Sequence, residues 1–156
     1  MTIRILATAL LAASTTLLAS TPAGATAVDY TGKDPYKTGC ARSSRVIKTA
    51  DLLTYVNNED VGDVTLMWSR TCKAAWGVIK VSPEATGAIL LATDLKEKGK
   101  TSYRRYTAGK GGRHWGPMLA VASGRCVYAW AEASTGRTVK DSGHGKTAMA
   151  CPGTAR

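Results

Sequence analysis

The amino-acid sequence predicts an all-β protein, a single small β-sandwich or barrel of about seven or eight short strands, stapled by disulfides. Short apolar segments recur along the chain between turns rich in glycine, proline and asparagine, which is the spacing typical of such folds. Four cysteines follow a stretch with the features of an export signal. An even number of cysteines in an exported chain indicates disulfides.

Residues 1–25 have the features of a secretory signal peptide. Arg4 supplies a positive start, Ile5 to Leu18 is almost entirely apolar, and Ala23-Gly24-Ala25 offers small residues to a signal peptidase. The apolar run is too short to span a bilayer, and the next charge is Asp29. We therefore predict a secreted, extracellular protein without a membrane span. Cleavage removes a single charged residue, so nearly all of the net charge of +10 remains.

Residues 26–39 are predicted to form a flexible N-terminal arm and turn ahead of a β domain over residues 40–156. The arm carries no strong core pattern, while Gly32, Asp34-Pro35 and Gly39 favour turns. Such an arm can add itself to a partner's cleft or sheet edge, with Tyr30 as its anchor. Ordinary fraying of a chain terminus is the commoner alternative.

The four cysteines, Cys40, Cys72, Cys126 and Cys151, allow three disulfide connectivities, which the sequence leaves open. We favour Cys40–Cys72 with Cys126–Cys151, because each bridge would staple one half of the chain. A zinc site is the rival interpretation. It is disfavoured because the chain has no C-x-x-C pair and both histidines stand apart from the cysteines.

The clearest strand signal lies between Val64 and Val81. Val64, Leu66 and Trp68 alternate with more polar neighbours, and Ala74, Trp76 and Val78 share one face of a second alternation. We expect two strands joined through Cys72, with both indoles in the core close to a disulfide.

The remaining segments are shorter. Residues 44–58 fit a helix and a strand about equally, and the neighbouring strands favour a strand. Further strands are predicted at residues 88–92, 101–107, 117–122 and 126–133, with a closing strand at 146–151. Residues 109–113 are predicted to be a flexible basic loop, and the glycine-containing stretch 134–145 a loop.

No pattern supports catalysis. His144 lies in the sequence DSGHGKT, where three neighbouring residues of one turn cannot assemble a nucleophile, a base and an orienting acid. His114 beside Trp115 is typical of a stacked surface histidine, and Glu132 is the one acid on a predicted strand. We therefore expect no catalytic residue, no cofactor and no metal, and a protein that is not an enzyme.

Basic residues are the better indication of function. Between Lys96 and Arg125 stand eight basic residues against one acid, Glu97. Arginine with tyrosine and tryptophan is the composition of protein–protein hot spots, whereas a solvated positive face is the simpler interpretation. The predicted partner-binding residues, besides Tyr30 in the arm, are Arg104, Arg105, Tyr106, Arg113 and Trp115. An acidic envelope polymer is a second possible partner, and nucleic acid is disfavoured outside the cell.

Three motifs carry a family resemblance. Residues 30–35 read YTGKDP, residues 38–41 read TGCA and residues 66–77 read LMWSRTCKAAWG. In these motifs the chain resembles the YjfA-like family, small exported proteins common in actinomycetes, best over about residues 29–81. Met67 departs from the pattern, where a basic residue is expected. The resemblance implies a β-rich disulfide domain, and it supplies no catalytic residues that could be carried over.

In size, export and composition the chain is also similar to the adaptor subunits of secreted, umbrella-shaped antibacterial toxin particles. There an adaptor joins a large toxin to lectin-like subunits, and no motif supports this second likeness. We therefore expect a secreted, non-enzymatic module that binds another secreted protein, as such an adaptor does. The alternatives are a cell-envelope or polysaccharide-binding module that uses Trp115 and Tyr106, and a protease inhibitor.

Overall fold

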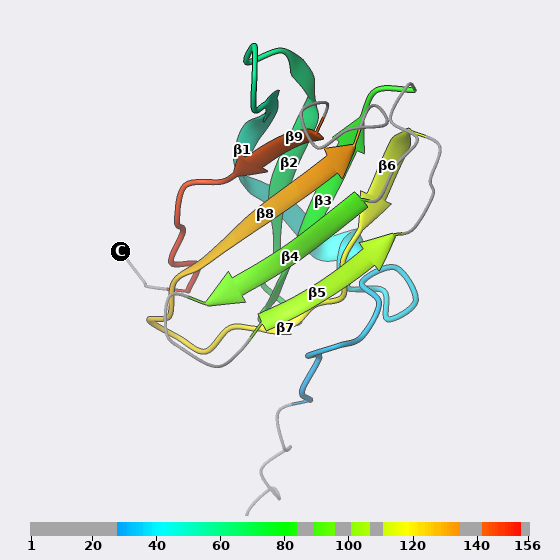
Figure 1. The fold of residues 1–156 in the computed structure, drawn as a ribbon. Coiled ribbons are helices and arrows are strands. Elements are labelled where there is room, and N and C mark those ends of the chain that lie inside the picture. The colour runs from blue at the N-terminus through cyan, green and yellow to red at the C-terminus, as the bar shows by residue number, and fades with distance from the viewer. Residues whose placement is uncertain (1–27, 84–88, 96–100, 107–110, 135–141, 154–156) are drawn as a thin grey trace, which may run out of the picture.

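The computed structural model describes residues 28–83, 89–95, 101–106, 111–134 and 142–153, and for 89–95 and 101–106 it describes the backbone alone (Figure 1). The expected signal peptide, residues 1–25, lies outside this part. A short 3-10 helix, η1 (Cys40–Ser43), precedes nine strands. The strands are β1 (Ser44–Thr54), β2 (Asp60–Ser69), β3 (Ala74–Val81), β4 (Ile89–Leu95), β5 (Thr101–Tyr106), β6 (Gly112–Trp115), β7 (Leu119–Ala120), β8 (Val127–Ser134) and β9 (Ser142–Lys146).

The nine strands form one antiparallel sheet in the order β5-β4-β8-β9-β1-β2-β3-β6, and β7 pairs with the first two residues of β3. The sheet curls into a half-barrel, so that β4 and β8 cross in front of β2 and β3 (Figure 1). Curling brings the two halves of the sheet face to face around one core, which a flat sheet of this size could not enclose. The predicted all-β fold with disulfides is therefore confirmed.

Most predicted strands are present, including the ambiguous segment, which forms β1. The structure contains the disulfides Cys40–Cys72 and Cys126–Cys151. They close loops of 32 and 25 residues, and each contributes about 3–4 kcal/mol in the chain-entropy model.

The last part of the sheet differs from the prediction. The stretch 134–145 is predicted to be a loop, yet its end belongs to β9. The described residues after Lys146 contribute one isolated bridge, between Val127 and Ala150, in place of the predicted closing strand. Glycine lowers strand propensity, but here it permits close approach. A Cβ on Gly143 would lie 2.1 Å from Cγ2 of Val61, and one on Gly145 would lie 2.3 Å from the carbonyl oxygen of Asp51. Likewise, the end of the predicted basic loop, from Gly112, is the start of β6.

Both indoles of the central hairpin are buried as predicted, but they lie on opposite faces of the sheet, and only Trp76 belongs to the cluster that contains the Cys40–Cys72 disulfide. Trp68 pairs with Ala75, and Trp76 pairs with Met67, so the register alternates the two rings between faces. Trp68 belongs to the core inside the half-barrel. Trp76 packs on the outer face with Cys40, Cys72 and Met118.

The N-terminal segment covers this outer face. The backbone amide of Gly32 donates to the carbonyl of Met118 at 2.8 Å, and the amide of Met118 donates to the carbonyl of Lys33 at 2.8 Å. Tyr30 packs against the cluster around Trp76. A flexible arm and turn is predicted for residues 26–39; within it, residues 31–34 are hydrogen-bonded to residues 115–120. Met118, which bonds to Gly32 and Lys33, is about 85 residues away in the chain, so no local sequence pattern predicts this pairing.

Candidate functional site

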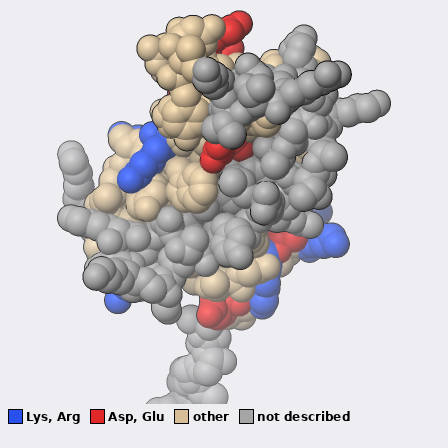
Figure 2. Space-filling model, in the orientation of Figure 1, with Lys and Arg blue, Asp and Glu red and all other residues tan. Residues whose placement is uncertain are grey.

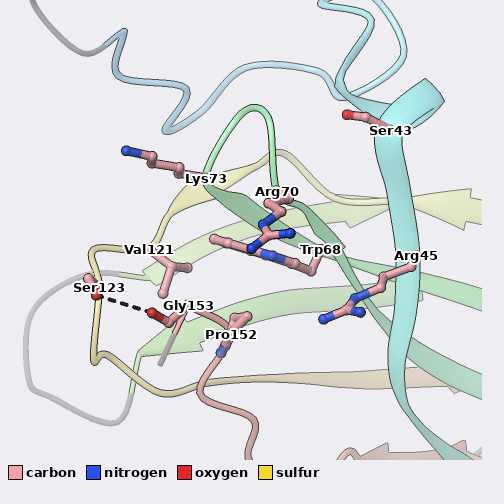
Figure 3. Close-up of a pocket in the computed structure, with 9 residues that line it drawn as sticks. All are labelled: Ser43, Arg45, Trp68, Arg70, Lys73, Val121, Ser123, Pro152 and Gly153. Atoms are coloured by element: carbon pink, nitrogen blue, oxygen red, sulfur yellow. Dashed lines mark hydrogen bonds between the residues drawn. The ribbon is translucent and has the colours of Figure 1, made fainter. Parts of the chain in front are cut away.

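A basic pocket lies at one end of the half-barrel, where the turn between β2 and β3 meets the C-terminal segment (Figure 3). It encloses about 650 Å³, within the range of ligand sites in proteins. Its lining residues come from four segments of the chain: Ser43, Arg45, Trp68, Arg70, Lys73, Val121, Ser123, Pro152 and Gly153.

The turn from Arg70 to Lys73 forms the first wall, and several bonds hold it. Cys72 is bridged to Cys40, and its backbone amide donates to Oγ of Ser69 at 3.2 Å. That hydroxyl also lies 2.8 Å from Oγ of Ser43. Lys73 has a positive φ of 48°, which closes the turn. Its carbonyl accepts a hydrogen bond from the amide of Val121 at 2.9 Å.

The C-terminal segment forms the opposite wall. The Cys126–Cys151 disulfide and two backbone hydrogen bonds between Val127 and Ala150 fix its course. The hydroxyl of Ser123 donates to the carbonyl oxygen of Gly153 at 3.2 Å, drawn as a dashed line in Figure 3. Both walls thus depend on a disulfide, and the pocket is held by covalent constraints on two sides.

The floor of the pocket is apolar and its rim is cationic. Trp68, Val121 and Pro152 are buried, whereas Arg45, Arg70 and Lys73 are exposed. Figure 3 shows the guanidinium group of Arg70 beside the indole of Trp68 and that of Arg45 pointing toward Pro152, while the side chain of Lys73 extends away from the two arginines. Within the part of the chain that the structure describes, these three cations make no ion pair or side-chain hydrogen bond. Clustered cations attract anions, and the guanidinium fork matches carboxylate and phosphate oxygens.

The sequence-predicted partner residues lie elsewhere. Arg113 and Trp115 are in β6, and the indole of Trp115 donates to Oδ2 of Asp34 at 3.2 Å. Tyr36 packs against Trp115 with ring centroids 4.5 Å apart, and Arg113 lies 5.8 Å from the Tyr36 centroid. Together with Tyr30 they hold the N-terminal segment on the sheet.

The carboxyl group of Asp34 is part of this contact. Partial burial raises its pKa, but hydrogen bonds from the Lys37 amide, the Trp115 indole and the Tyr36 amide outweigh that effect and lower the pKa below its ordinary value. The ionised form of Asp34 therefore stabilises the attachment of the N-terminal segment.

Arg104, Arg105 and Tyr106 belong to β5, at the other end of the strand order from β6, and their side chains are not described. Among the described residues on the face in Figure 2, Lys and Arg are interspersed with Asp and Glu and form no continuous basic field. The structure brings Tyr30, Arg113 and Trp115 to the N-terminal segment on the outer face, whereas the side chains of β5 lie outside the described part.

Arg45, Arg70 and Lys73 are not among the partner-binding residues that the sequence predicts. The spacing of these cations from the cysteines could have indicated the cluster, because Arg70 and Lys73 flank Cys72 and Arg45 follows Cys40 by five residues. The favoured Cys40–Cys72 bridge therefore already placed these cations near one another.

Other chemistry finds little support among the described residues. His114 lies in β6 and His144 in β9, and Glu132 is the cross-strand neighbour of His144. No group of three or more histidine, cysteine or acidic side chains suited to a metal ion occurs in the described ranges. None of the described residues belongs to a helix with the length and apolarity of a membrane span.

The fold and the pocket define a disulfide-stapled half-barrel domain with a basic pocket at one end. The chain belongs to the family described as "Protein of unknown function (DUF2690)", whose model matches residues 28–130. It is 32% identical over 107 residues to "Uncharacterized protein YjfA" of Bacillus subtilis (strain 168). The matched stretch covers 69% of this chain and 64% of the relative. The chain thus spans slightly less than two thirds of that protein.

These matches confirm the resemblance to the YjfA-like family. Neither description states an activity or a partner, and neither refers to a toxin particle. No solved structure matches the chain.

Proposed function

We propose that this protein is a secreted, non-enzymatic interaction module that docks an acidic segment of another secreted protein in the basic pocket. The observation that carries the proposal is that Arg45, Arg70 and Lys73 line one pocket and have no ion-pair partner among the described residues. Carboxylates of a partner would pair with these cations at a small cost, because the cations need not leave an existing salt bridge.

The apolar floor favours a protein segment over an acidic envelope polymer. Trp68, Val121 and Pro152 offer buried carbon surface beneath the charged rim. A peptide can place an apolar side chain on that floor and its acidic neighbours at the rim, whereas a uniformly charged polymer uses only the rim. Deep apolar anchors surrounded by polar contacts are typical of protein interfaces.

The particular role proposed is that of an adaptor in an extracellular antibacterial assembly of the umbrella type, bound to a large toxin or a lectin-like subunit. Size, the predicted leader and the basic composition support this role. The disulfides are compatible with an extracellular location.

Affinity purification of the tagged protein from culture supernatant, followed by mass spectrometry, tests the proposal. The unmodified protein should retain a secreted partner that Arg45→Glu/Arg70→Glu does not retain. The matched control is Lys48→Glu/Lys80→Glu, which changes the net charge equally at exposed strand residues outside the pocket. Equal recovery with both double variants would contradict the proposal, and recovery of anionic polymer alone would favour the envelope alternative.

A further inference from the structure

Strand β8 carries its large side chains on the outside of the half-barrel. The inward residues Val127, Ala129, Ala131 and Ala133 are 0–1% exposed, and three of these four side chains are a single methyl group. The alternate residues Tyr128, Trp130 and Glu132 point to the outer face and are half-buried. A sheet with one face in water normally has polar residues there, so two neighbouring aromatic rings on this face are unexpected.

These side chains line a groove on the outer face of β8 and β9. In the register, Lys146 lies opposite Trp130 and His144 lies opposite Glu132. Tyr55, from the turn after β1, completes the lining. The groove has a volume of about 330 Å³, at the lower end of the range for small-ligand sites.

Ring contacts fix the ends of the groove. Tyr55 and His144 are stacked, with ring centroids 4.0 Å apart and an interplanar angle of 11°. The ammonium group of Lys146 lies 4.1 Å from the centroid of the Tyr128 ring. These contacts orient the imidazole of His144 and place the cation over Tyr128, so the lining is organised before any ligand binds.

Two ligand classes fit this groove poorly. Strand addition by a peptide needs a free sheet edge, but β8 is already paired with β4 and β9, and β9 with β8 and β1. A polyanion needs excess positive charge, but the described residues that line the groove supply one ammonium group together with the carboxylate of Glu132. The charge of these described residues is nearly balanced, in contrast to that of the basic pocket.

The remaining chemistry is that of an uncharged, polyhydroxylated ring. A pyranose has an apolar C–H face, which packs on an aromatic plane, and equatorial hydroxyl groups, which need donors and acceptors at the ring edge. Trp130 supplies the plane. Glu132 accepts hydrogen bonds, and His144 has one donor and one acceptor nitrogen when neutral. We propose that this groove binds a neutral glycan, with one pyranose ring against Trp130. This site is separate from the basic pocket and does not depend on the function proposed for it.

Native affinity electrophoresis toward the cathode, in gels containing hydroxyethylcellulose, galactomannan or glycol chitin, tests the proposal. At least one of these neutral polymers should retard the protein, and Trp130→Ala should weaken binding about tenfold or more. Tyr55→Ala should weaken it several-fold, because His144 loses its stacking partner.

Tyr36→Ala is the matched control, since Tyr36 is also an exposed tyrosine, at 40% against 55% for Tyr55, and does not line the groove. It should bind like the unmodified protein, as should Arg45→Glu/Arg70→Glu. The proposal is overturned if no neutral polymer retards the protein, if the Tyr55 and Tyr36 variants bind alike, or if salt abolishes the retardation. If Trp130→Ala does not fold, Tyr55→Ala decides the matter, because its side chain is largely in solvent.

Discussion

Replacement of Trp76 by alanine is the sharpest test of the second core on the outer face of the sheet. Trp76 is fully buried among Cys40, Val78 and Met118, beneath the N-terminal segment. Burial of a tryptophan removes about 150–250 Å² from water, worth about 4–6 kcal/mol at 25 cal/mol per Å². Measured Trp→Ala changes in cores cost about 3–5 kcal/mol, and we expect a loss of stability in that range.

The indole nitrogen of Trp76 makes a second variant informative. It is buried and has no hydrogen-bond partner within the described part of the chain, which costs about 1–3 kcal/mol. Trp76→Phe loses roughly 1–2 kcal/mol of burial and packing but also removes this unpaired donor. The two effects nearly cancel, so Trp76→Phe should lie within about 1 kcal/mol of the unmodified protein.

Urea melts of the oxidised protein, followed by far-ultraviolet circular dichroism, measure both variants. Free thiols should be absent throughout, so that the disulfides are the same in each sample. A loss below about 1 kcal/mol for Trp76→Ala would place the ring at the surface. A loss for Trp76→Phe as large as that for Trp76→Ala would show that the indole nitrogen is hydrogen-bonded.

Three further changes test other contacts. The lowered pKa of Asp34 means that its ionised form stabilises the fold above pH 4 and that this contribution is lost as the pH falls through the folded-state pKa. The stability gap between the unmodified protein and Asp34→Asn should therefore be present in thermal melts at pH 6 and shrink as the pH falls below 4, and a constant gap would refute the linkage. Gly145→Ala should cost about 1–3 kcal/mol in urea melts, because its Cβ would meet the Asp51 carbonyl oxygen at 2.3 Å; a neutral result would rule out this close approach. Cys126→Ser/Cys151→Ser should cost about 3–4 kcal/mol and weaken the docking of an acidic peptide, since it frees the C-terminal wall of the pocket; unchanged docking would show that the wall needs no bridge.

The sequence predicted the strands well where side-chain alternation is strong. The alternation of Val64, Leu66 and Trp68 corresponds to the inner face of β2, and that of Ala74, Trp76 and Val78 to the outer face of β3. Each alternation was assigned correctly within its strand. The prediction that both indoles lie near the same disulfide was wrong, because the hairpin register places the two alternations on opposite faces of the sheet.

Segments shaped by distant contacts were harder to predict. β9 contains two glycines, and its pairing depends on Val61 and the carbonyl of Asp51, which lie more than 80 residues earlier. The segment around Tyr30 has the sequence features of a flexible terminus, but it is hydrogen-bonded to Met118. The basic pocket likewise depends on a distant contact, because the Cys40–Cys72 disulfide brings Arg45 near Arg70 and Lys73. The density of basic residues along the chain instead favours Arg104 and Arg105 as partner-binding residues.

The central claim is that Arg45, Arg70 and Lys73 act together as a docking site for acidic protein segments. It is tested most directly by fluorescence anisotropy of a labelled peptide with alternating glutamate and leucine residues, titrated with the protein at low and at physiological salt. The unmodified protein and Lys48→Glu/Lys80→Glu should bind with similar affinity that falls with salt, while Arg45→Glu/Arg70→Glu should bind at least about tenfold more weakly. Equal weakening by the two double variants would contradict the claim, because binding would then follow net charge and not the pocket.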